Sequence, residues 1–130
     1  MKILVVDDDG VTRKLLGLYL KGTGYEVEFA ENGLDALEKL GIEDINIVLT
    51  DLNMPYMDGI EFTRNMKIEP LYKSIPVLMV TTESDDEEKQ RAFEAGADGY
   101  LVKPVTAETI NATIRELLKR IFSHGGEINV

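Results

Sequence analysis

The hydrophobic residues of this chain fall into five short runs, separated by longer stretches in which apolar and polar positions follow a helical period. The runs are four to six residues long and rich in Ile, Val and Leu, which is typical of β-strands. They occupy residues 3–6, 25–29, 45–50, 76–81 and 99–102. The pattern therefore predicts five strands.

Apolar residues three or four positions apart predict a helix after each strand. They are Leu15, Leu18 and Tyr19; Leu34 and Leu37; Phe62 and Met66; and Ile110, Ile114, Leu117, Leu118 and Ile121. Residues 85–95 are less apolar and are expected to form a partly exposed helix. Gly22, Gly41, Gly96 and Pro104 stand at the expected element boundaries.

Strict alternation of strand and helix predicts an α/β fold with a parallel sheet, because each strand must be reached by a right-handed crossover. Strands 3–6, 45–50 and 76–81 are apolar throughout, as expected of central strands, whereas YEVEF at 25–29 alternates like an edge strand. These features predict a doubly wound, flavodoxin-like (βα)5 sheet of order 2-1-3-4-5. In this topology ligands bind at the carboxyl ends of strands 1 and 3.

A length of 130 residues suits one domain with a sizeable core, which we place at residues 1–122. The tail 123–130, SHGGEINV, is expected to be mobile and without chemistry. His124 is the only histidine and there is no cysteine. Histidine catalysis, disulfides and thiolate zinc sites are therefore not expected.

Charge and hydropathy narrow the function classes further. The net charge is −10 and the 14 Lys and Arg residues are scattered, which disfavours direct nucleic-acid binding. No apolar run approaches the roughly 20 residues of a membrane span, and the N-terminal run meets an acid at residue 7. We expect a cytoplasmic protein that does not bind membranes.

Carboxylates follow two strands that are neighbours in the predicted sheet. Asp7 and Asp8 come directly after the first strand, and Asp51 follows the third. Clustered like charges are unfavourable unless a cation neutralises them. Oxygen ligands at an edge open to water suit Mg²⁺, with Mn²⁺ as a substitute. The alternative is that acids only favour a helix N-terminus, an interpretation we keep for Asp9 as a helix cap.

Two further strand ends carry groups that complement these acids. Thr81 ends the fourth strand, and Lys103 follows the fifth. A hydroxyl, an ammonium and a metal around the central carboxylate of Asp51 are what an aspartyl nucleophile needs to accept a phosphoryl group. Alternatively, Lys103 is a salt-bridge partner and Thr81 a β-branched strand terminus. Four strand ends with suitable groups favour the catalytic interpretation.

The motifs VVDDD, LTDLNMPYMDG, VLMVTTES and AGADGYLVKP, in this order and spacing, resemble the receiver domain of two-component response regulators, of the single-domain chemotaxis type. The resemblance covers residues 2–122. It implies that a histidine kinase phosphorylates Asp51, and that Thr81 and Lys103 hold the phosphoryl oxygens. It also implies that Asp8, Asp51 and the Asn53 carbonyl bind Mg²⁺, with Asp7 acting mainly through water.

The resemblance implies further roles around this site. Tyr100 would be an aromatic switch that turns inward when Thr81 moves toward the phosphoryl group. This would change the surface formed by the helix at 85–95, the strand at 99–102 and the helix that carries Ile110 to Ile121. The alternative for Tyr100 is a packing aromatic on a strand. Asn53 and Glu83 would tune the phosphoryl lifetime, here toward a short-lived mark. Pro55 and Gly59 would shape the loop after Asp51, and the Lys103–Pro104 bond would be cis.

The sequence is therefore interpreted as a stand-alone response regulator, expected to be monomeric, that catalyses its own phosphorylation and dephosphorylation without a turnover substrate. Its expected partner is a histidine kinase or a histidine phosphotransfer protein. A phosphorelay intermediate is the alternative. Asp85 and Asp86 stand where enteric chemotaxis regulators have basic residues, which counts against binding to a flagellar motor. A flavin module is disfavoured by the carboxylate loop, and a phosphohydrolase by Asn53 in place of a second acid.

Overall fold

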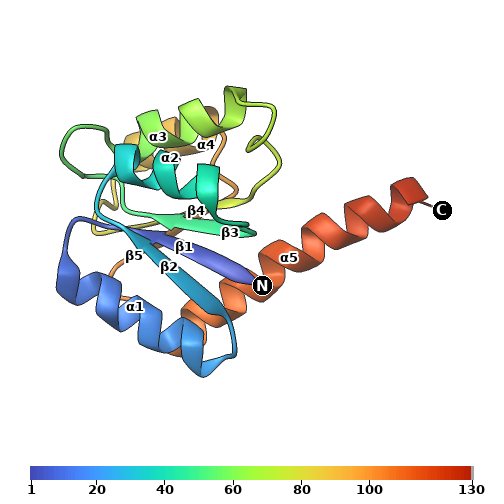
Figure 1. The fold of residues 1–130 in the computed structure, drawn as a ribbon, viewed down its shortest axis with the longest axis horizontal. Coiled ribbons are helices and arrows are strands. Elements are labelled where there is room, and N and C mark those ends of the chain that lie inside the picture. The colour runs from blue at the N-terminus through green and yellow to red at the C-terminus, as the bar shows by residue number, and fades with distance from the viewer. Residues whose placement is uncertain (130) are drawn as a thin grey trace.

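The computed structural model describes the backbone of residues 1–129 and the side chains of residues 1–121. Strands and helices alternate along the whole chain (Figure 1). The elements are β1 (Lys2–Val6), α1 (Gly10–Gly22), β2 (Glu26–Ala30), α2 (Gly33–Ile42), β3 (Ile47–Thr50), α3 (Gly59–Ile68), β4 (Val77–Thr81), α4 (Asp86–Ala95), β5 (Gly99–Val102) and α5 (Ala107–Asn129). The five strands and five helices expected from the sequence are confirmed.

All strand pairs of the sheet are parallel, and their order is β2-β1-β3-β4-β5, as predicted. β2 lies at an edge, which explains its alternating pattern. In the register of β1 and β3, Val6 is opposite Thr50. The residues that follow these two, Asp7 and Asp51, therefore emerge side by side at the carboxyl edge of the sheet.

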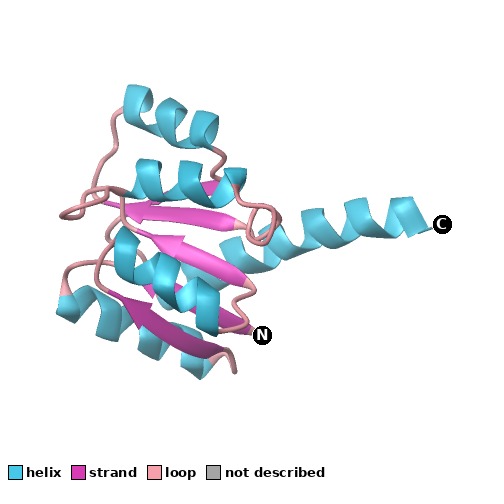
Figure 2. Ribbon diagram, turned by 45° about the horizontal axis from the view of Figure 1, so that its top comes forward, coloured by secondary structure: helices cyan, strands magenta, loops and turns pink. Residues whose placement is uncertain are grey.

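Helices cover both faces of the sheet, with α1 and α5 on one side and α2, α3 and α4 on the other (Figures 1 and 2). Side chains of β1 alternate between these two layers. Ile3 and Val5 pack with residues of α1 and α5, whereas Leu4 and Val6 pack with residues of α2 and α3. Burial on both faces explains why the central strands are apolar at consecutive positions. None of the described helices is long and apolar enough to cross a membrane.

Polar caps fix where the helices begin, and so where the strand-to-helix loops lie. Asp9 caps α1, as expected, because its carboxylate accepts a hydrogen bond from the Thr12 amide. Asn32, Asp58 and Asp85 cap α2, α3 and α4 in the same way. Such caps satisfy amides that would otherwise have no partner at a helix start. Each of the four capping loops follows a strand of the parallel sheet and therefore lies at its carboxyl edge.

The last helix differs from the sequence-based expectation. Its apolar periodic positions end at Ile121, whereas α5 continues to Asn129 (Figure 1). The expected mobility of residues 123–130 remains a prediction. Glycine lowers helix stability by only about 1 kcal/mol and does not forbid the helical backbone, so Gly125 and Gly126 are compatible with this extension. The division of the chain at residue 122 remains a prediction, and the side chains of residues 122–130 lie outside the described part.

Candidate functional site

Three carboxylates meet at the carboxyl edge of the sheet. Asp7, Asp8 and Asp51 each offer an oxygen atom, and these atoms all lie within 4.8 Å of one another. Asp7 is buried, with 2% of its surface exposed, whereas Asp8 is exposed and Asp51 is intermediate. The cluster thus has an inner acid and an outer rim that water reaches. The convergence that the sequence predicted is present.

Lys103, just after β5, bridges two of these acids. Its ammonium lies 2.7 Å from Asp7 Oδ2 and 3.3 Å from Asp51 Oδ2. Burial would lower the pKa of Lys103, but the hydrogen bond from its ammonium to Asp7 and the charges of Asp51 and Asp7 outweigh this effect and raise the pKa. Lys103 therefore stays protonated and supplies a fixed positive charge beside Asp51.

For Asp7, the buried acid of the cluster, burial has the larger effect on the pKa. Burial raises the pKa of the Asp7 carboxyl above its ordinary value of 3.8, and the hydrogen bond from Lys103 offsets this only in part. Asp7 Oδ1 also accepts a hydrogen bond of 2.9 Å from the Asp9 amide. A buried carboxylate with incomplete neutralisation gains from a further cation nearby.

The donor set fits Mg²⁺. Asp7, Asp8 and Asp51 present only oxygen atoms, and the exposed position of Asp8 leaves room for coordinated water. A small, hard dication that keeps part of its hydration shell prefers such a site. Asn53 lies two residues beyond Asp51 in an exposed loop, and its role as a carbonyl ligand remains a prediction.

The backbone and side chain of Asp51 are held by short contacts. The Leu52 amide donates to Asp51 Oδ1 at 2.7 Å, and the Thr50 hydroxyl donates to the Asp51 carbonyl oxygen at 2.9 Å. The Gly59 amide donates to Leu52 O at 2.7 Å. A Cβ atom on Gly59 would lie only 2.1 Å from that Asp51 carbonyl oxygen. Glycine is therefore required at position 59 by close backbone approach, not by its dihedral angles.

Thr81 and Tyr100 are connected through the backbone of Glu83. Thr81 is fully buried, and its hydroxyl accepts a hydrogen bond of 3.3 Å from the Glu83 amide. The Tyr100 hydroxyl donates to the Glu83 carbonyl oxygen at 2.7 Å. In the described part of the chain no hydrogen bond joins Thr81 to Asp51. Burial raises the pKa of Tyr100, so its hydroxyl remains a donor at neutral pH.

Two contributions to the site did not come from the sequence analysis. Thr50 holds the Asp51 carbonyl, and the Arg13 guanidinium donates to the backbone oxygen of Asp7. The position of Thr50 immediately before Asp51 in the sequence could have indicated the first of these contacts. The second joins a helix to a strand end and had no local signal. The Lys103–Pro104 peptide bond is cis.

A doubly wound sheet with clustered acids, a lysine and a buried threonine at its carboxyl edge is the architecture of a receiver domain. Comparison with known proteins agrees, because the sequence model of the response regulator receiver domain matches residues 3–115. The chain belongs to this family, and thus to the proteins of two-component signalling.

Relatives of two kinds resemble the chain. It is 44% identical over 121 residues to the sensor histidine kinase RcsC of Escherichia coli, a match that covers 93% of this chain but 12% of that protein. Chemotaxis response regulator CheY4 of Vibrio cholerae is 40% identical with a TM-score of 0.84, covering 89% of this chain and 97% of that one. The receiver domain of a histidine kinase from Syntrophus aciditrophicus is 32% identical with a TM-score of 0.84, covering 92% and 91%.

Proposed function

We propose that Asp51 accepts a phosphoryl group from the phosphohistidine of a histidine kinase or of a histidine phosphotransfer protein. The observation that carries this proposal is the placement of Asp51 at an open edge, within 4.8 Å of two further carboxylates and 3.3 Å from a lysine ammonium. The protein acts in the cytoplasm as a monomeric signalling switch. It has no turnover substrate of its own.

In the reaction, a carboxylate oxygen of Asp51 attacks phosphorus, the bond from phosphorus to the histidine nitrogen breaks, and that nitrogen recovers its electron pair. Lys103 compensates negative charge on the transferring group, and Thr81 offers a hydroxyl to one of its oxygens. The Leu52 amide fixes the carboxylate by its hydrogen bond to Oδ1. Mg²⁺ held by Asp7, Asp8 and Asp51, together with the Asn53 carbonyl, would neutralise the phosphoryl oxygens.

Thr81 and Tyr100 pass the modification to the outer surface. When the Thr81 hydroxyl turns toward the phosphoryl group, it leaves the Glu83 amide, and the loop that also accepts from Tyr100 is released. Tyr100 then turns inward and changes the face formed by α4, β5 and α5. A shift of the equilibrium from 1:99 to 99:1 requires about 5.5 kcal/mol of differential stabilisation. Asn53 and Glu83, each two residues beyond a residue of the site, tune the lifetime of the phosphoryl group, and the mark is short-lived.

Phosphorylation can be tested with acetyl phosphate as donor and the mass of the intact protein as readout. We expect a mass gain of one phosphoryl group in the presence of Mg²⁺, and none after chelation or in Asp51→Asn. Asp44→Asn is a matched control, because it removes an exposed acid between α2 and β3, at the opposite edge of the sheet. A mass gain in Asp51→Asn, or an equal gain without a divalent metal, would contradict the proposal.

A phosphorelay role is the second candidate. It is favoured by the 44% identity to RcsC, a sensor histidine kinase, of which this chain spans about an eighth. A relay domain returns its phosphoryl group to a histidine, whereas an output regulator retains it until hydrolysis. The phosphorylated protein should be mixed with histidine phosphotransfer proteins, with label on histidine as readout. Recovery of phosphohistidine faster than hydrolysis supports the relay, and hydrolysis alone supports the stand-alone regulator.

A further inference from the structure

A hollow lies between α1 and the edge strand β2, on the face of the sheet opposite to α2 (Figure 1). It measures about 370 Å³. Its lining residues are Gly10, Arg13, Lys14, Gly17, Leu18, Lys21 and Phe29. None of them is an acid of the carboxylate cluster, and Arg13 contacts that cluster through its hydrogen bond to the Asp7 backbone oxygen. Volumes of roughly 300–1,000 Å³ are usual for sites that bind small molecules.

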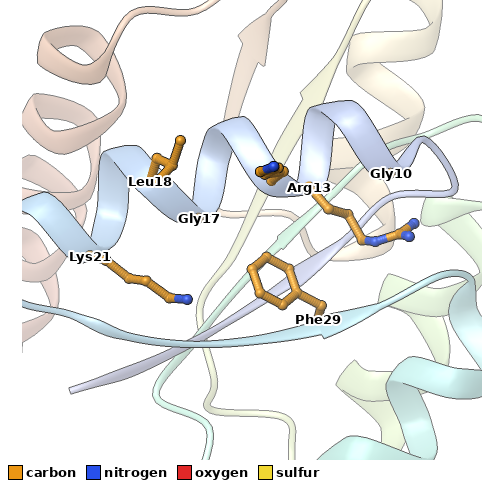
Figure 3. A pocket seen from close by; sticks show the side chains of 7 residues that line it. Gly10, Arg13, Gly17, Leu18, Lys21 and Phe29 are labelled. Carbon is orange, nitrogen blue, oxygen red and sulfur yellow. The ribbon is translucent and has the colours of Figure 1, made fainter.

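The hollow exists because one face of α1 carries glycines where the helix meets β2. A Cβ atom on Gly17 would lie 2.6 Å from Phe29 Cζ, so the glycine allows the ring to lie directly against the helix. Gly10, two turns earlier on the same face, also has no side chain to fill the space. Figure 3 shows the Phe29 ring pointing from β2 toward α1 below Gly17. The result is an aromatic floor that is only partly covered.

Positive charge surrounds this floor. Arg13, Lys14 and Lys21 are three of the seven lining residues, and no acid lines the hollow, although the chain as a whole has a net charge of −10. The Lys21 ammonium lies 5.6 Å from the centre of the Phe29 ring. In Figure 3 the side chains of Lys21 and Arg13 lie on either side of that ring. The Arg13 guanidinium lies 3.9 Å from the exposed carboxylate of Glu31.

We propose that this α1–β2 pocket, lined by the seven residues above, binds a small anionic ligand with a flat aromatic ring, of the nucleoside monophosphate class. The ring stacks on Phe29, where Lys21 now lies, and the phosphate is held by Arg13 and Lys14. Arginine and lysine at one end and an aromatic face at the other complement such a ligand at both ends.

The shape of the site favours this ligand over simpler anions. Inorganic phosphate would use the cations but leave the Phe29 face and Leu18 exposed. A neutral nucleoside would use the ring but make no ionic contact with Arg13 and Lys14. Binding of both parts by one rigid ligand adds their contributions, and each charge-assisted hydrogen bond is worth about tenfold or more in affinity.

The test is a titration of the ¹⁵N-labelled protein with adenosine 5′-monophosphate, followed by amide chemical shifts. We expect saturable shifts centred on Gly10, Gly17 and Phe29. Adenosine and inorganic phosphate should each bind at least about tenfold more weakly, because each provides half of the contacts. No saturable shift at these amides, or an equal affinity for phosphate alone, would overturn the proposal.

Variants separate this site from general attraction of anions. Lys14→Gln should lower the affinity at least about tenfold, and Lys14→Arg should restore most of it. Lys73→Gln removes the same charge from an exposed position outside the pocket and should have no effect. If an acidic peptide shifts these amides but the nucleotide does not, the pocket is a protein-docking surface and the proposal is wrong.

The outcome is independent of phosphorylation at Asp51. Asp51→Asn should keep wild-type affinity for the nucleotide, because Asp51 does not line the pocket. A protein that binds no nucleotide but is phosphorylated by acetyl phosphate would therefore refute this inference alone.

Discussion

Gly59→Ala tests whether the close approach of α3 to the central acid positions the site. The added Cβ atom would lie 2.1 Å from the Asp51 carbonyl oxygen, whereas ordinary contacts begin at 3.4 Å. The backbones must therefore separate by about 1.3 Å, or one must rotate. Overpacking of this kind costs about 1–3 kcal/mol. A loss of about 2 kcal/mol would lower Tm by roughly 7 °C in a domain of this size.

The same displacement should affect chemistry more than stability. A nucleophile moved by about 1 Å can lose about 100-fold in rate, because the attacking oxygen leaves its productive position. We expect Gly59→Ala to fold, to unfold at lower urea concentration, and to accept a phosphoryl group from acetyl phosphate about 100 times more slowly. Urea unfolding and the time course of the intact mass measure the two effects.

Gly22→Ala is the matched control for this experiment. Gly22 ends α1, its φ is not left-handed, and nothing lies within 4 Å of an added Cβ. Alanine there should stabilise the protein by about 0.4–1 kcal/mol through the unfolded chain and leave phosphorylation unchanged. The reasoning is refuted if Gly59→Ala is as stable as Gly22→Ala and reacts at the wild-type rate.

Three further changes test other contacts. Lys103→Met should lower the free energy of unfolding by about 2 kcal/mol at pH 8, because Asp7 and Asp51 lose their cation. The pKa of Asp7 is raised above 3.8 in the folded state, so the carboxylate is protonated as the pH falls through that raised pKa. The difference in the free energy of unfolding between Lys103→Met and wild type should then become smaller. A difference that grows toward low pH would disprove this. Tyr100→Phe removes the 2.7 Å hydrogen bond to Glu83 O and should cost about 1 kcal/mol in urea unfolding, whereas an unchanged midpoint would show that this bond adds nothing. Asn111→Leu should be neutral or stabilising by about 1 kcal/mol, because the buried Asn111 Oδ1 has no hydrogen-bond partner among the described residues and Nδ2 donates only one long hydrogen bond, of 3.5 Å, to Tyr19 O; a large loss in Tm would show that the amide has a role.

Local sequence patterns determined the elements and the location of the candidate site. Short apolar runs separated by stretches of helical period predicted the five strands and five helices. The alternation of apolar and polar residues within 25–29 identified β2 as an edge strand. Parallel neighbours end at the same edge, so Asp7 and Asp51 had to emerge together once β1 and β3 paired. Short-range rules of this kind also located Asp9 as a cap.

Other features were decided only by the tertiary structure. The shorter contact of Lys103 is with Asp7 and not with Asp51, although Asp51 follows β3, which lies nearer to β5 in the sheet than β1 does. The absence of a side chain at Gly59 matters because α3 approaches the Asp51 carbonyl, and Gly17 matters because α1 packs against Phe29. These contacts join residues that are distant along the chain, and their geometry depends on how each helix packs on the sheet. A sequence period shows which face of a helix is buried, but it does not show how closely two backbones approach.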